Sequence, residues 1–423
     1  AVEWDLAAAT TYAANFASKA AGVGHIHIFA GDIKDWSPGE LNGEVDVILG
    51  GPPCQGFSAL GKQDPEDPRN QLWREYIRVV GKLQPKIFVI ENVDRFFRSP
   101  EYTELCAAAS QGGELENYVL EAKHLVAADY GVPQVRKRTI VLATRRDLVE
   151  LHPERRPLRH PVPTHSKSVG PGLWQDVRPW ETVQTVFGTP QAPKTPLVPG
   201  TTELPEGRID LIGKEVPGPF RTGQLHIGRN PTDLSLRRYK AIPPGGNRHD
   251  LPDELSTENW INHRSGSGDV MGRLHLDRPS VTIRTEFYKP EKGRYLHPWA
   301  HRPITHYEAA LLQGFPEDFL WCGRSLDRSE TPYRWALPGP SPDRSTGTCE
   351  SRDLFDHFPS TDRCVRKELP EQRGKPIHRS ERSSSVVGSL RQLLEEQQII
   401  VAVQSPGLIS VGIRFGVRGD RLE

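Results

Sequence analysis

"VDVILGGPPCQGFS", residues 45–58, joins a short apolar run to a turn made of glycines and prolines. Apolar runs of this length that end at glycine are typical of strands buried on both faces of a parallel sheet. Three glycines permit tight backbone turns, and two prolines fix the chain directly before Cys54. A single cysteine after a strand is most often an inert buried thiol, so the role of Cys54 depends on the segments that accompany it.

The flanking segments extend the strand pattern. "KIFVIEN" at 86–92 and "RTIVLAT" at 138–144 predict two further buried strands, and residues 71–83 carry apolar side chains along one helical face. Alternating strands and helices predict an α/β catalytic domain with a doubly wound sheet over residues 1–150. Such sheets bind ligands at the carboxyl ends of their strands, here the stretches after Leu49 and Ile90.

The rest of the chain divides by composition. Prolines recur from 157 to 219, and long helical patterns are missing up to about 277, so we expect a loop-rich second domain over 151–277, with a long linker as the alternative. Regular patterns return over 278–322, which we assign to the catalytic domain. Residues 323–423 form an atypical tail, and its stretch 324–385 is rich in Arg, Ser, Pro and Asp, a composition typical of disorder.

Composition excludes several classes of protein. The 423 residues include 54 basic and 54 acidic side chains, so attraction to nucleic acid must come from local clusters rather than from net charge. The five cysteines lack the Cys-x-x-Cys spacing of zinc sites and the pattern of a disulfide framework, so we expect no metal. With no signal peptide and no long apolar run, the chain reads as a soluble, cytoplasmic monomer without a membrane partner.

Three short motifs then occur in a fixed order: Pro53-Cys54-Gln55, Glu91-Asn92-Val93, and Q-V-R-K-R from Gln134 to Arg138. Together they resemble the catalytic motifs of the bacterial cytosine-C5 DNA methyltransferase family. Further stretches resemble that family's other motifs in the same order: "EWD" at 3–5, "GDI" at 31–33, "DPRNQL" at 67–72 and "RPITHYEAALLQGFPEDF" at 302–319. Each triplet alone is weak, but the ordered set is specific and covers roughly residues 1–320.

The resemblance implies a Rossmann-like methyltransferase sheet that uses S-adenosyl-L-methionine, with a target-recognition domain at 151–277. It implies that Cys54 adds as a thiolate to carbon 6 of a flipped-out cytosine, while Glu91 protonates ring nitrogen 3. Arg138, assisted by Arg136, would hold the base carbonyl oxygen, a task that suits a planar and permanently charged guanidinium.

The resemblance also implies the binding residues. For the cofactor they are Glu3, Trp4, Asp32, Ile33, Pro52 and Leu72. For the DNA substrate they are Pro53, Gln55, Ser58, Asn92, Val93 and Gln134, with Arg229, Arg237 and Arg248 from a basic stretch of the loop-rich domain. Duplex DNA is the expected partner, together with a cognate restriction endonuclease in a restriction–modification system.

Two family motifs have no counterpart at their usual places. No Phe-x-Gly-x-Gly loop precedes Glu3, and no Gly-Asn-Ala-Val-Pro segment follows 314–323, so we expect an incomplete sheet and weak cofactor binding. The glycines of 415–419 are spaced differently from that loop and do not count as a displaced copy. The apolar alternation of 397–415 is compatible with a hairpin about 405–407, and its role is open.

Two alternatives stand beside the DNA methyltransferase. A catalytically dead DNA-binding relic would keep the recognition domain but not hold cofactor. A tRNA cytosine-C5 methyltransferase would share the fold, although the long segment between Arg138 and Asp277 favours duplex DNA.

Overall fold

The computed structural model describes residues 1–17, 28–39, 45–52, 71–150, 157–168, 177–263, 265–323 and 399–401. All of them belong to one compact unit, which comprises residues 1–340 and 398–423. Pro53, Cys54, Gln55 and Ser58 lie outside the described residues, as do "DPRN" at 67–70 and most of the tail. The expectations of disorder over 324–385 and of a hairpin about 405–407 therefore stay predictions.

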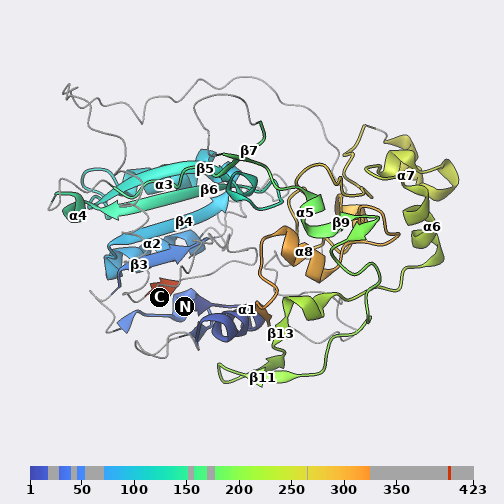
Figure 1. Ribbon diagram of the computed structural model, residues 1–423. Coiled ribbons are helices and arrows are strands. Elements are labelled where there is room, and N and C mark those ends of the chain that lie inside the picture. Colours follow the sequence, from blue (N-terminus) through green and yellow to red (C-terminus); the bar gives the residue numbers. More distant parts are fainter. Residues whose placement is uncertain are drawn as a thin grey trace, which may run out of the picture. The chain divides into compact units, whose positions relative to one another are not determined.

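A five-stranded sheet forms the centre of the catalytic region, in the order β15-β3-β4-β6-β5 (Figure 1). Three strands run parallel: β15 (Ile399–Val401), β3 (Val47–Gly50) and β4 (Ile87–Val93). The other two, β6 (Lys137–Arg145) and β5 (Tyr118–Val126), pair antiparallel with each other, and β6 pairs antiparallel with β4. The three strands expected from the apolar runs are confirmed, although the sheet is mixed rather than wholly parallel.

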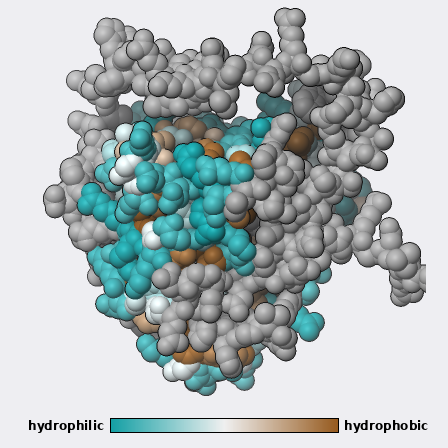
Figure 2. Space-filling model, turned by 90° about the vertical axis from the view of Figure 1, so that its left-hand side faces the viewer, coloured by the Kyte–Doolittle hydropathy of each residue, from teal (hydrophilic) through white to brown (hydrophobic). Residues whose placement is uncertain are grey.

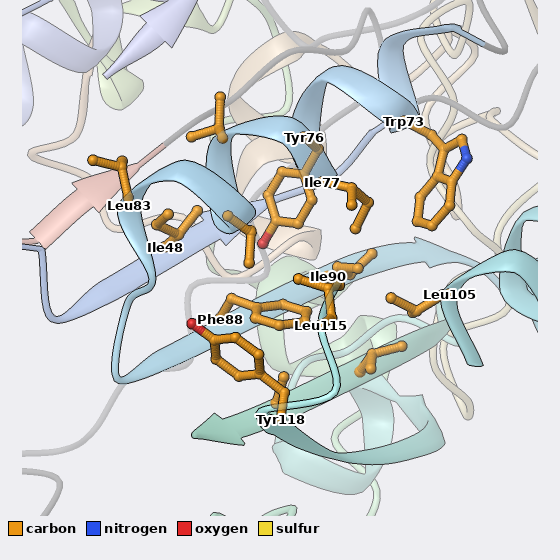
Figure 3. Close-up of a cluster of buried hydrophobic side chains, with 14 of the residues drawn as sticks. Ile48, Trp73, Tyr76, Ile77, Leu83, Phe88, Ile90, Leu105, Leu115 and Tyr118 are labelled. Atoms are coloured by element: carbon orange, nitrogen blue, oxygen red, sulfur yellow. The ribbon is translucent and has the colours of Figure 1, made fainter. Parts of the chain in front are cut away.

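Helix α2 (Gln71–Leu83) covers one face of this sheet with the apolar stripe that the sequence predicted. Tyr76 is buried, and its hydroxyl donates a 2.9 Å hydrogen bond to the carbonyl of Val89 in β4. Phe88 of β4 packs edge-on against Tyr76 and Tyr118, at ring-centroid distances of 6.3 Å and 5.0 Å (Figure 3). This aromatic contact ties α2, β4 and β5 into one core.

A second, two-stranded parallel sheet lies at the start of the chain, formed by β1 (Val2–Glu3) and β2 (Phe29–Ala30). Asp5 caps α1 (Leu6–Tyr12) by accepting hydrogen bonds from the amides of its first turn. Val2 belongs to the same hydrophobic core as Ile48 of β3, so the two sheets share one apolar interior.

The remaining regular elements are short, which agrees with the loop-rich composition of 157–277. They are α3 (Pro100–Ala108), α4 (Arg146–Glu150), β7 (His165–Ser166), β8 (Arg178–Pro179), α5 (Val183–Phe187), β9 (Gly188–Thr189), β10 (Ala192–Pro193), β11 (Arg208–Asp210), β12 (Glu215–Pro217), β13 (Phe220–Arg221), α6 (Asp233–Ala241), α7 (Glu258–Asn262), α8 (His306–Leu312) and β14 (Leu320–Trp321).

The return segment after 277 completes the core of the loop-rich region. Tyr307 and Leu312 of α8 are buried in one cluster with Phe187 and Phe220, and β14 pairs with β13. Residues of the π-helical turn after α1 also hold this segment, since the side-chain amide of Asn15 bonds both the carbonyl and the amide of Leu320. The 278–322 stretch thus contacts both regions rather than the catalytic region alone.

Hydrophilic residues prevail over the coloured part of the face in Figure 2, with apolar residues scattered among them. Within the described ranges, no helix combines the length and the apolarity that a bilayer span requires.

The Phe88 contact yields a stability prediction. Phe88→Ala should lower the free energy of unfolding by about 3–5 kcal/mol, because it leaves a cavity among buried rings. Urea unfolding followed by fluorescence would measure the change. Val162→Ala, at a side chain that is 65% exposed, is the matched control and should change stability by less than about 0.5 kcal/mol. Equal effects of the two variants would show that Phe88 is not central to the core.

Candidate active site

Glu91 and Arg138 form the charged centre of the candidate site. Arg138 lies opposite Val93 in the β4–β6 ladder, and Glu91 is two residues before Val93, so the two side chains are diagonal neighbours on one face of the sheet. Nε of Arg138 lies 2.8 Å from Oε1 of Glu91, and both side chains are largely buried. Oε1 has no aligned hydrogen-bond donor among the described residues, so charge holds this pair and the oxygen keeps its capacity to bond.

Burial sets the protonation of Glu91. Removal from water raises the pKa of this carboxyl, and the charges of Arg138 and Arg136 only partly offset that effect. The same burial lowers the pKa of Arg136 to about 10, and Nε of Arg136 has no hydrogen-bond partner among the described residues. The site therefore combines a carboxyl group that keeps its proton more readily than usual with a guanidinium that has a donor to spare.

Asn92 connects this centre to the segment that carries the thiol. Its buried side-chain amide donates a 2.7 Å hydrogen bond to the carbonyl of Pro52, the residue at which description of the turn ends. Since β3 and β4 are parallel and Gly50 pairs with Ile90, both strands end at the same edge of the sheet. The start of the Cys54 turn is thereby held beside the Glu91 carboxyl group.

The segment before β6 alternates as the sequence predicted. Gln134, Arg136 and Arg138 are buried or half-buried, whereas Val135 and Lys137 are exposed. Gln134 differs from its expected role as a substrate contact, because it is only 1% exposed.

Both ends of the Gln134 amide are used inside the protein. Its nitrogen lies 3.4 Å from the carbonyl of Leu312, and its oxygen lies 3.3 Å from the amide of Ile283. Gln134 therefore holds the return segment against the start of β6, and we assign it a positioning role.

The residues expected at the cofactor gather at the ends of β1 and β2. Glu3 is buried, and burial raises its pKa to about 8, although the amide of Asp5 donates a 2.8 Å hydrogen bond to its carboxylate. Trp4 beside it is 66% exposed. In the parallel register Glu3 pairs with Ala30, so the turn that contains Asp32 and Ile33 follows directly alongside.

Two parts of this set are already engaged. The carboxylate of Asp32 accepts a hydrogen bond from the amide of Lys34, and Ile33 is buried in the core. Leu72 of α2 is partly buried against the same core. An unpaired surface indole next to a buried carboxylate leaves Trp4 and Glu3 best placed for an adenosine, since the ring can stack and the carboxylate can accept from hydroxyl groups.

The three arginines expected at DNA have different environments. Arg248 is buried, and its guanidinium donates a 2.9 Å hydrogen bond to the carbonyl of His263, so we reassign it to holding the loop. Arg229 bonds the carbonyl of Tyr288 and lies over that ring, 5.4 Å from its centroid. Arg237, by contrast, is exposed on α6, where Lys240 is exposed as well.

Thr139 is a site residue that the sequence did not reveal. It is buried opposite Asn92 in the ladder, and its hydroxyl lies 3.2 Å from the carbonyl of Val93 and 3.4 Å from that of Asp94. It thereby fixes the chain just after Glu91. A threonine inside an apolar strand is common, so no sequence signal marks this role. In the described ranges, no group of His, Cys, Asp and Glu has the geometry of a metal site.

Comparison with known proteins supports this reading of the geometry. Residues 1–328 match the family model described as C-5 cytosine-specific DNA methylase. The chain is 33% identical over 292 residues to the Type II methyltransferase M1.HphI of Haemophilus parahaemolyticus, covering 68% of this chain and 63% of that protein.

Two further relatives give similar values. M.DdeI of Desulfomicrobium norvegicum is 28% identical over 346 residues, covering 78% of this chain and 75% of the relative. M.XorII of Xanthomonas oryzae pv. oryzae is 32% identical over 292 residues, covering 65% and 61%. The chain thus spans somewhat less than two thirds of the length of M1.HphI.

The Asn92 contact yields the second prediction. Asn92→Ala leaves the buried carbonyl of Pro52 without a donor, so the free energy of unfolding should fall by about 1–3 kcal/mol. Denaturant unfolding would measure it. Asn259→Ala, at an exposed position on α7, is the control and should have an effect below about 0.5 kcal/mol. A neutral Asn92→Ala variant would contradict the proposed link between β4 and the turn.

Proposed function

Because this chain belongs to the C-5 cytosine-specific DNA methylase family, we propose that it transfers a methyl group from S-adenosyl-L-methionine to carbon 5 of cytosine in duplex DNA. The observation that carries the proposal is the buried Glu91–Arg138 pair, which lies at the sheet edge where β3 leads into the Cys54 turn. A carboxyl group with a raised pKa beside a cysteine turn suits addition to a pyrimidine ring better than hydrolysis or phosphate chemistry.

Cys54 is the proposed nucleophile. Its thiolate forms a bond to carbon 6 of the ring, and the electron pair of the 5,6 double bond moves toward the ring nitrogen and oxygen. Glu91 donates its proton to nitrogen 3, which keeps the ring neutral and makes carbon 5 electron-rich. Arg138 and Arg136 add positive charge near the base oxygen and near the thiolate, and nearby positive charge lowers a cysteine pKa.

The cofactor supplies an electrophilic methyl group to carbon 5 when it is bound. Glu3 and Trp4 are the residues that suit its adenosine part, since one offers carboxylate acceptors and the other an exposed ring. After transfer, carbon 5 loses its proton to a base, the bond between sulfur and carbon 6 breaks, and nitrogen 3 returns its proton to Glu91. Atoms and charge then balance, and Cys54 is a thiolate again.

A base inside a duplex is out of reach of these groups, so the target cytosine must leave the stack at a cost of a few kcal/mol. The exposed Arg237 and Lys240 of α6 suit contacts to phosphates that hold the duplex meanwhile. We further propose that the enzyme acts as a monomer and protects host DNA from a cognate restriction endonuclease. The relatives named Type II methyltransferases support that partner.

Covalent trapping tests the reaction. DNA that contains 5-fluorocytosine cannot lose its carbon-5 substituent, so the full chain with S-adenosyl-L-methionine should form a complex that survives denaturing electrophoresis. Cys54→Ala should form none, and tRNA with the same substitution should trap little. A complex with the Cys54→Ala variant would refute the assignment of the nucleophile, and preferential trapping on tRNA would refute the substrate.

Glu91→Gln keeps the shape of the side chain but has no acidic proton, so methyl transfer should fall by about 100-fold or more while DNA affinity stays nearly unchanged. Because only protonated Glu91 can donate, wild-type turnover should also decline as the pH rises through the raised pKa of this carboxyl. Tritium transfer assays across pH would measure both effects. Near-normal turnover of Glu91→Gln would reduce Glu91 to a structural residue.

The sorted arginines allow a matched pair of variants. Arg237→Ala should weaken DNA binding on any sequence and reduce the salt dependence of the affinity by about one ion, as expected when one phosphate contact is lost. Arg248→Ala should instead lower thermal stability, since the carbonyl of His263 loses its buried donor. Fluorescence anisotropy at several salt concentrations and thermal melts would separate the two. The reverse pattern would contradict our sorting.

A further inference from the structure

Strand β15 comes from the far C-terminal part of the chain, yet it lies in the catalytic sheet (Figure 1). It pairs parallel with β3 in the register Ile399 to Val47, Ile400 to Ile48 and Val401 to Leu49. All three of its residues are apolar, which is typical of a strand covered on both faces. β15 is therefore a regular member of the sheet, at the edge of β3 opposite β4.

A strand has two hydrogen-bonding edges, and both edges of β3 are occupied. β4 takes one edge and β15 takes the other, so no further strand can join β3 at this level of the ladder. The position next to the strand of the thiol turn is thus filled by residues that follow all other described elements in the sequence.

The direction of β15 decides where the chain goes next. Because β15 is parallel to β3 and β4, its carboxyl end lies at the same edge as Gly50 and the Glu91–Asn92 pair. The sequence that follows Val401 reads A-V-Q-S-P-G-L-I-S-V-G and places glycines at 407 and 412. A strand that leads into a glycine-containing turn at this edge is the general arrangement by which open α/β sheets bind nucleotide-like ligands.

We propose that residues 399–412 supply the central strand and the cofactor-binding turn of the catalytic sheet, so that the order of these parts along the chain is permuted. The spacing of Gly416 and Gly419 argued against a displaced glycine loop. The position of β15 instead directs attention to Gly407 and Gly412, the glycines that follow the strand most closely. The strand assignment stands on its own, whereas the ligand, S-adenosyl-L-methionine, rests on the proposed function.

Two deletions test the proposal on the full chain. Removal of 399–423 should weaken S-adenosyl-L-methionine binding by about 100-fold or more, since several hydrogen bonds to the ligand are lost. Removal of 345–390, which lies in the separate unit of residues 341–397, is the control and should leave the affinity within about threefold. Titration calorimetry measures the affinities, and equal affinity after both deletions would overturn the cofactor assignment.

Hydrogen exchange tests the strand without reference to any ligand. Amides of residues 47–50 should be protected in the full chain and in the 345–390 deletion, but should exchange faster when 399–423 is removed or when Ile400→Asp is introduced. Ile400→Val is the matched control and should keep the protection. Unchanged exchange in the Ile400→Asp variant would overturn the strand assignment. Failure of the intact chain to bind the cofactor, with the exchange pattern as expected, would instead refute the proposed function.

A deletion can also unfold the protein, so a rearranged chain provides an independent test. Residues 391–423 are moved in front of Ala1 through a flexible linker, which delivers the same strand from the other end of the chain. Cofactor affinity and protection of 47–50 should then equal those of the original chain. Gly407→Val in either arrangement should weaken cofactor binding by about tenfold with protection unchanged, because a side chain blocks close approach of the backbone. A rearranged chain that neither binds nor protects β3, or a neutral Gly407→Val, would contradict the proposal.

Discussion

The ion pair between Glu91 and Arg138 is the interaction on which the site depends. A carboxyl group this far from water is costly in its charged form, and a guanidinium 2.8 Å away offsets only part of that cost. The balance leaves the acid protonated to a higher pH than usual while a donor remains near the oxygens that a base would present. The antiparallel β4–β6 ladder is what makes the pair possible, because it sets two charged residues of distant segments diagonally across one face.

The surrounding contacts serve to keep that pair and the thiol turn in register. Asn92 reaches from β4 to Pro52, Thr139 reaches from β6 to the carbonyls after Asn92, and Gln134 reaches to the return segment. Each of these side chains points away from the charged centre and bonds to backbone. Polar residues next to a site thus act by holding backbone, which agrees with their burial.

Arginines have a similar structural task in the loop-rich region. Loops leave carbonyl groups that neither helix nor sheet satisfies, and a buried guanidinium has five donors to offer them. Arg273 is almost wholly buried and bonds the carbonyls of Tyr239, Ile242, His297 and Ala300, while Arg294 bonds those of Gly245, Gly246, Gly268 and Arg273. A basic residue in this region is therefore a candidate for DNA contact only where its side chain is exposed, as Arg237 is.

The sequence by itself determined the strands around Glu91 and Cys54, the helix between them and the alternation of Gln134, Arg136 and Arg138, because period and composition are local properties that short segments carry. It also determined the family, since the ordered motifs specify chemistry as well as fold. Only the tertiary structure decided that Gln134 and Arg248 are bonded to backbone, that Thr139 supports the site, and that Ile399–Val401 pairs with β3. Those outcomes depend on which distant segments meet, and a residue's own neighbours in the chain do not encode the partner that its side chain or strand edge finds in space.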